Sequence, residues 1–138
     1  RRVNHLRERH VLLLHAQLIA DTGGSEGVRD EGLLDAALDA PHAGFAGQEF
    51  FPSVEAKAAR LAFGLIRNHA FVDGNKRIGV LAMLVLLDIN GITVEAGDDE
   101  LVALGLALAE GELDVDAVLK WIVAHAADSG GAVVCPGS

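Results

Sequence analysis

The sequence predicts a small all-α domain, and three observations lead to that prediction. Apolar residues recur with the 3.6-residue period of a helix through most of the chain. Residues that cap helices stand where these stretches begin, and glycine, asparagine or proline stands where they end. The two-residue period of a strand is found in one short stretch of note, residues 92–96.

The periodic stretches predict six helices. The first covers residues 6–20, and the second and third follow the capping residues Asp30 and Ser53. The fourth follows the segment 69–77 and continues to about residue 89; it is almost wholly apolar, which predicts a buried helix at the centre of the fold. The fifth and sixth begin at the acidic residues Asp98 and Asp114, as the helix dipole favours.

The composition predicts one domain. A chain of 138 residues, 51% of them hydrophobic, can bury a single core, which we place at residues 1–128 with a flexible tail over 129–138. No leader pattern and no apolar run long enough to span a membrane is evident, so we expect a cytoplasmic protein without membrane contact. The net charge of −9 argues against direct nucleic-acid binding.

The segment 69–77, His-Ala-Phe-Val-Asp-Gly-Asn-Lys-Arg, combines groups that suit phosphate chemistry. His69 has the near-neutral pKa range that a general base for a hydroxyl requires, and Asp73 offers a carboxylate to Mg²⁺. Gly74 lets the backbone approach a ligand closely, and donors and positive charge follow at residues 75–77. The helix after this segment adds unpaired N–H groups at its first turn. We therefore predict that phosphate is bound by Gly74, Asn75, Lys76 and Arg77.

This segment resembles the motif H-x-F-x-(D/E)-G-N-(G/K)-R of the Fic/Doc family, and every fixed position is present. The similarity extends from about Leu14 to Trp121 and is greatest with the compact Doc branch. The resemblance implies a compact helical fold with a short flap, a buried anchor at Phe71, and catalysis by His69 with ATP and Mg²⁺. It also implies a toxin that phosphorylates a Ser or Thr of elongation factor Tu and so arrests translation, restrained by a Phd-like antitoxin.

Two positions favour transfer of the γ-phosphate over transfer of AMP. Lys76 is typical of Doc toxins, whereas AMP-transferring relatives usually have glycine there. Val80 stands where those relatives have a second arginine, whose charge-assisted contact with a triphosphate is worth about 1.5–3 kcal/mol. Transfer of AMP or another nucleotide monophosphate remains the alternative enzyme. A third candidate is not primarily an enzyme: a module that mainly binds its antitoxin or another partner and has only weak catalysis.

A second candidate region joins the second and third helices. The segment from Pro41 to Pro52 has no helical period and is long for a connection. In Fic relatives this position is a flap that pairs with an extended stretch of the target protein. The resemblance thus implies a target-binding flap, and its residues are Phe45, Ala46, Gly47, Gln48 and Glu49. The plainer alternative is that its phenylalanines cover the core.

Three other features of the sequence bear on function. Arg67 is a candidate contact for substrate or partner, because basic residues gather between positions 57 and 77. His5, His10 and His15 are spaced by five residues, so they share no helix face and predict no metal site. The segment 22–27 fits the pattern (S/T)-x-x-x-E-(G/N) by which some Fic proteins block their ATP site, but its two central glycines disfavour a helix there, so we interpret the match as chance.

Overall fold

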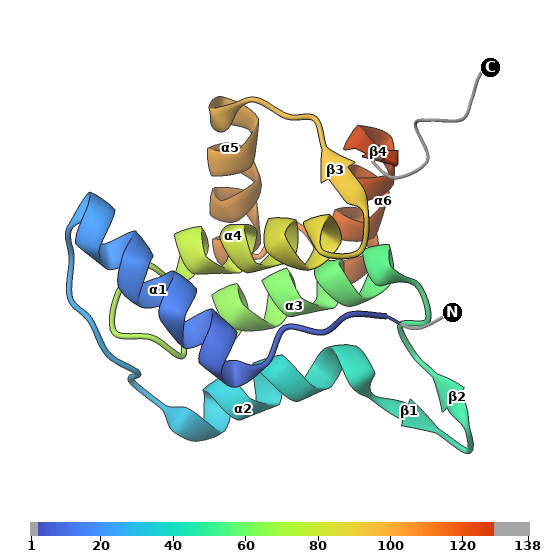
Figure 1. Ribbon diagram of the computed structural model, residues 1–138, viewed down its shortest axis with the longest axis horizontal. Coiled ribbons are helices and arrows are strands. Elements are labelled where there is room, and N and C mark those ends of the chain that lie inside the picture. Colours follow the sequence, from blue (N-terminus) through green and yellow to red (C-terminus); the bar gives the residue numbers. More distant parts are fainter. Residues whose placement is uncertain (1–2, 129–138) are drawn as a thin grey trace.

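The computed structural model describes residues 3–128 and shows a mostly helical chain (Figure 1). Its α-helices within that range are α1 (Glu8–Thr22), α2 (Glu31–Asp39), α3 (Val54–Asn68), α4 (Asn75–Asp88), α5 (Asp98–Ala109) and α6 (Val115–His125). The predicted helical fold class is confirmed. The predicted tail at 129–138 lies outside the described residues, so the domain boundary at residue 128 stays a prediction.

Helices α3 and α4 pack against each other at the centre, α2 and α6 lie against α3, and α1 and α5 lie against α4. The close approach of α3 and α4 depends on Gly79, since a Cβ atom there would lie 2.4 Å from Cγ1 of Ile66. This pairing fixes the end of α3 and the start of α4 as neighbours. The segment that joins them is residues 69–74, the first part of the motif.

The predicted capping residues act as expected. Asp30 Oδ1 accepts a hydrogen bond from the backbone N–H of Leu33 at 3.0 Å, and Ser53 Oγ accepts one from Ala56 at 3.0 Å. Asp114 Oδ1 accepts one from Ala117 at 2.8 Å. Each bond satisfies an N–H group that the first turn of a helix leaves unpaired, so helices α2, α3 and α6 begin where the sequence predicts.

Two small antiparallel strand pairs complete the described fold. Strand β3 (Ile92–Val94), within the predicted stretch, pairs with β4 (Ala126–Asp128). Strands β1 (Gly44–Phe45) and β2 (Gln48–Glu49) follow a short 3₁₀ helix, η1 (Ala40–His42), and form a hairpin. Its two turn residues both have positive φ, 53° and 81°, as a type I′ turn requires. Neither the hairpin nor β4 could be predicted from the sequence, because strands of two or three residues show no detectable alternation.

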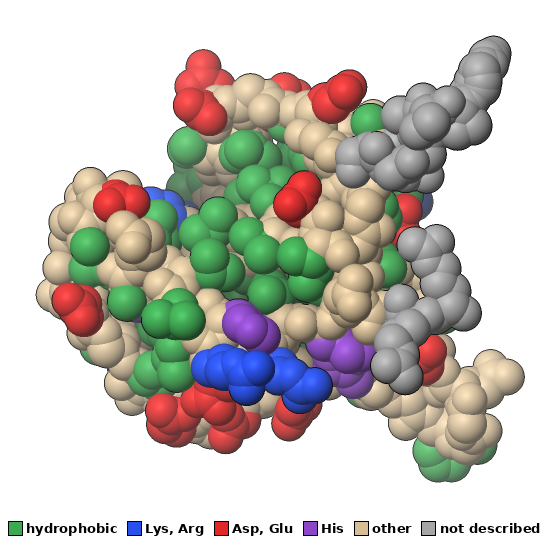
Figure 2. Space-filling view, in the orientation of Figure 1, with side chains coloured by type: hydrophobic (Ala, Val, Ile, Leu, Met, Phe, Trp, Pro, Cys, Tyr) green, Lys and Arg blue, Asp and Glu red, His purple; other side chains and the backbone are tan. Residues whose placement is uncertain are grey.

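Helix α4 is central but not buried all round. Ile78, Met83 and Leu87 are fully buried, whereas Leu84 and Val85 are only half-buried. Figure 2 shows hydrophobic side chains gathered on the molecular surface where α4 lies in Figure 1. The predicted buried helix therefore keeps an apolar face that this chain leaves partly open. Within residues 3–128, we find no helix of the length and apolarity that a membrane span requires.

Phe71, in the motif, is among the largest fully buried side chains of the core. Replacing it by alanine should lower the free energy of unfolding by about 3–5 kcal/mol, because the transfer energy of the ring is lost and a cavity remains. Urea unfolding followed by circular dichroism measures this. Val102→Ala is the matched control: Val102 is 70% exposed, and its truncation should change stability by no more than about 0.5 kcal/mol. Equal effects of the two truncations would contradict the assignment of Phe71 to the core.

Candidate active site

His69 ends helix α3 in a left-handed conformation, with φ 53° and ψ 49°. Its backbone is held by Arg29, whose Nε donates to the His69 carbonyl at 2.7 Å and whose Nη2 donates to the Asn68 carbonyl at 3.2 Å. Arg29 thus satisfies carbonyl groups that the end of a helix leaves unpaired. The His69 ring is exposed and makes no hydrogen bond to any residue of the described range 3–128, so its nitrogens are available to a ligand.

Asn75 locks the motif segment from the other side. Its side-chain oxygen accepts from the Phe71 N–H at 2.9 Å, and its side-chain nitrogen donates to the Phe71 carbonyl at 3.0 Å. Asn75 is buried, and so is Phe71. Since the side-chain amide is already paired, Asn75 could serve the predicted phosphate contact through its backbone N–H.

The chain before α2 runs alongside the motif segment. The Val72 N–H donates to the Gly27 carbonyl at 3.0 Å, and the Arg29 and Asp30 N–H groups donate to the Ala70 carbonyl at 2.7 and 3.1 Å. Val28 and Phe71 form an isolated antiparallel bridge. The loop that carries His69 and Asp73 is therefore paired along its length before any ligand binds.

The Asp73 carboxylate lies next to the start of α4. Oδ1 accepts from the Gly74 N–H at 2.8 Å, and Oδ2 accepts from the Ser25 N–H at 3.2 Å. The Ser25 and Gly74 N–H bonds lower the pKa of Asp73, and the positive charge of Arg77 adds to this. Each oxygen keeps a lone pair, so an ionised carboxylate is presented to the pocket. Gly24 is required here, because it has φ 116° and a Cβ atom would lie 2.5 Å from Oδ2 of Asp73.

His15 of α1 supports the same loop and was missed as a site residue by the sequence analysis. Its Nε2 lies 2.7 Å from the Asp73 carbonyl oxygen and must carry the proton, because a carbonyl only accepts. Its ring stacks on Phe71 with centroids 3.9 Å apart. A signal existed in the sequence: His15 lies four residues from both Val11 and Ile19, on the buried face of α1. A lone polar residue on such a face needs a partner.

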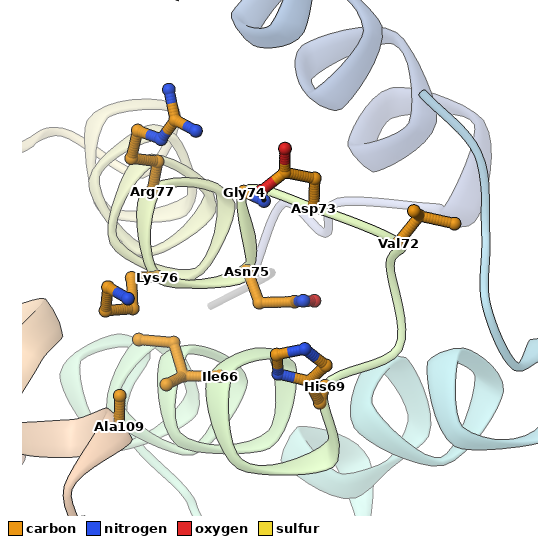
Figure 3. A pocket seen from close by; sticks show the side chains of 9 residues that line it. All are labelled: Ile66, His69, Val72, Asp73, Gly74, Asn75, Lys76, Arg77 and Ala109. Atoms are coloured by element: carbon orange, nitrogen blue, oxygen red, sulfur yellow. Dashed lines mark hydrogen bonds between the residues drawn. The ribbon is translucent and has the colours of Figure 1, made fainter. Parts of the chain in front are cut away.

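The start of α4 forms the rest of the site. Gly74 is its N-cap with φ 75° and offers no side chain to the first-turn N–H groups. Lys76 and Arg77 lie in this first turn, where the helix dipole disfavours cations and favours anions. Figure 3 shows His69 on one side of the pocket and Asp73, Gly74 and Arg77 on the other side. The arrangement is electrostatically suited to an anion.

A pocket of about 220 Å³ lies between these groups. It is lined by Ile66, His69, Val72, Asp73, Gly74, Asn75, Lys76, Arg77 and Ala109. Drug-sized ligands occupy pockets of about 300–1,000 Å³, so this one suits a phosphate group better than a whole nucleotide. The structure thus brings His69, Asp73 and the four predicted phosphate-binding residues to one place.

Two other predicted site regions do not line this pocket. Arg67 donates to the carbonyls of Leu108 and Ala109 at 3.4 and 3.1 Å, so its guanidinium joins α3 to the end of α5. The flap residues 45–49 form the hairpin at the opposite end of α3 from His69 (Figure 1). The predicted contacts of both regions with substrate or partner stay predictions.

The segment 22–27 is not a helix beyond Thr22, as its glycines predicted. The Thr22 hydroxyl donates to the Leu18 carbonyl at 2.7 Å and accepts from the Arg77 guanidinium. The Ser25 N–H bonds to Asp73, so the end of α1 and the residues just after it contact both the Arg77 cation and the Asp73 carboxylate. The segment therefore orients site residues, a role that the sequence analysis did not predict.

Comparison with known proteins gives three matches. Residues 5–87 match the Fic/DOC family. The chain is 48% identical over 77 residues to "Toxin Doc" of Mycolicibacterium smegmatis, which covers 56% of this chain and 59% of that protein. It is 31% identical over 116 residues to "Protein kinase doc" of Escherichia phage P1, which covers 84% of this chain and 90% of the phage protein. The first alignment thus spans less than two thirds of the relative it matches.

The state of Asp73 can be tested by its titration. Folding lowers the pKa of this carboxyl, so ionised Asp73 stabilises the folded state. This stabilisation is fully present above the pKa of the unfolded state and is lost as the pH falls through the pKa of the folded state. Carbon-13 NMR should show a midpoint below the ordinary range of aspartate. Ser25→Pro, which removes the N–H donor, should raise it, whereas Ser25→Ala, which keeps the donor, should not. A midpoint that Ser25→Pro leaves unchanged would contradict the assigned cause.

Proposed function

The chain belongs to the Fic/DOC family, and from this premise we propose that it is a toxin that transfers the γ-phosphate of ATP, with Mg²⁺, to a Ser or Thr hydroxyl of another protein. The names of its relatives, a Doc toxin and a Doc protein kinase, support this. The observation on which the proposal mainly depends is the pocket itself: an ionised Asp73, the uncapped start of α4 and a His69 ring that no residue of the described range 3–128 engages all face one small volume.

Each of these groups has a role in the proposed reaction. The hydroxyl oxygen of the target forms a bond to the γ-phosphorus while the bond from that phosphorus to the β–γ bridging oxygen breaks, and ADP leaves. His69 takes the proton of the attacking hydroxyl. The first-turn N–H groups of α4, with Lys76 and Arg77, neutralise the charge on the transferring phosphoryl group. Every role is assigned to a group that lines the pocket.

The donor set also fits Mg²⁺. This ion is usually held by one or two carboxylates and phosphate oxygens, and Asp73 supplies one ionised carboxylate with free lone pairs at the pocket. When bound, Mg²⁺ would act as a Lewis acid and stabilise the negative charge of the phosphate oxygens. Asp73 would hold it, and the Ser25 and Gly74 N–H groups would keep the carboxylate oriented.

Two observations favour γ-phosphate transfer over AMP transfer. Val80 is buried, with a Cγ atom 3.4 Å from where a Cβ on Gly105 would lie, so position 80 offers the pocket no cation. Lys76 adds a cation at the first turn of α4. Without a cation at position 80, the charge-assisted contact that would hold a triphosphate in the orientation for AMP transfer is missing.

An antitoxin of the Phd kind is proposed as the regulatory partner, and elongation factor Tu as the target. The target comes from the family resemblance alone. For the antitoxin, the structure offers a groove of about 490 Å³ between α1 and α4, with Leu13 69% exposed and Ile89 39% exposed beside Val85. Apolar surface of this kind is suited to a partner's amphipathic segment.

Transfer of label from ATP decides between the candidate reactions. Purified protein, Mg²⁺ and elongation factor Tu should yield labelled factor from γ-labelled ATP and none from α-labelled ATP. His69→Ala should reduce the rate by about 10²–10⁴-fold, the usual contribution of general base catalysis. His125→Ala is the matched control, since His125 pairs with Glu100 on another part of the surface. Transfer of label from the α-phosphate would show AMP transfer. Transfer from neither phosphate would contradict both enzyme candidates and favour the binding module.

A further inference from the structure

Lys57 is a buried lysine whose charge the proposed chemistry does not use. It lies at the start of α3, and its side chain is 3% exposed. A buried ammonium is costly unless ion pairs and hydrogen bonds replace its lost water. Within residues 3–128, the Lys57 Nζ donates to two groups: the carboxylate of Glu49, at the end of β2, and the carbonyl of Phe51, two residues later, at 2.5 Å. The cost of burying Lys57 is thus offset only while the hairpin stays against α3.

This contact also decides which way the hairpin faces. Gly44 pairs with Glu49, and Phe45 pairs with Gln48. Successive side chains of a strand point to opposite faces, so a Glu49 turned toward Lys57 places Phe45 and Gln48 on the outward face. Phe45 is 78% exposed there, and Phe50, just after β2, is 61% exposed. Figure 1 shows the hairpin projecting from the body of the molecule.

The contact is far from the pocket. Lys57 and His69 are separated by twelve residues of chain along α3, which corresponds to about 18 Å at the rise of an α-helix. No hairpin residue lines the pocket. An effect of Lys57 on the reaction would therefore act on the binding of the protein substrate and not on the chemical step.

We infer that Lys57 is a positioning residue for the protein substrate: its buried ammonium holds the hairpin so that Phe45 faces outward and contacts the target. The inference rests on the proposed function for the identity of that partner. The flap needs such an anchor, because its two strands have only two residues each and their pairing alone is weak. The contact with Lys57 would keep the flap fixed against α3.

Two variants test this role, with a matched control. Lys57→Met keeps the buried stem and removes the ammonium, and Glu49→Gln removes the partner's charge at a side chain that is 53% exposed, which limits any effect on folding. Lys120→Met is the control. It removes a lysine that pairs with Asp116 at 3.3 Å on the exposed surface of α6.

The first readout is amide hydrogen exchange of residues 43–51. Lys57→Met should speed exchange of the Phe50 N–H, which donates to the Ala43 carbonyl, by about tenfold or more, while the α4 amides keep their rates. Glu49→Gln should change it in the same direction, and Lys120→Met should not change it. Unchanged exchange in both hairpin variants would overturn the inference.

The second readout is phosphate transfer to purified elongation factor Tu. Lys57→Met should raise KM for the factor by about fivefold or more with kcat nearly unchanged, the signature of lost substrate binding. A fall in kcat at unchanged KM would overturn the inference. If the wild-type protein transfers no phosphate, the proposed function fails, and the exchange experiment decides the role of Lys57 by itself.

Discussion

Two hydrogen bonds between the Asn75 side chain and the backbone of Phe71 hold the segment between α3 and α4, and the arrangement of the site depends on them. They fix where α3 ends and α4 begins, and so the relative positions of His69 and Asp73. Buried backbone groups left unpaired would cost about 1–3 kcal/mol each, which makes this pairing a strong constraint on the loop. The buried Phe71 ring ties the same loop to the core.

Helix α1 and the chain just after it hold the charged residues of the site from a second side. His15 holds the backbone of Asp73, the Ser25 N–H holds its carboxylate, and Thr22 contacts Arg77. The two cations at the first turn of α4 oppose the helix dipole, a local cost that a bound anion would relieve. The two cations, the ionised carboxylate and a His69 ring without a hydrogen-bond partner in residues 3–128 form the arrangement on which the proposed phosphate chemistry rests.

Much of this was accessible from the sequence, for identifiable reasons. Helix starts follow from local capping, so Asp30, Ser53 and Asp114 could be assigned without knowing the fold. The motif residues are contiguous, so their gathering in one pocket follows from chain connectivity. The partners of His15 and Arg29 could not be assigned, because each side chain reaches the motif from more than 35 residues away and depends on how α1 and the chain before α2 pack. The hairpin escaped detection because its strands are too short to show a period.

We conclude that the motif loop is already fixed in the free protein, and native-state hydrogen exchange of the Phe71 amide is the measurement that tests this claim. If Asn75 and the core hold the loop, the Phe71 N–H should exchange only through global unfolding, as slowly as the core amides of α4. Exchange as fast as that of exposed loop amides, in protein without nucleotide, would show that the loop forms only when a ligand binds and would contradict the claim.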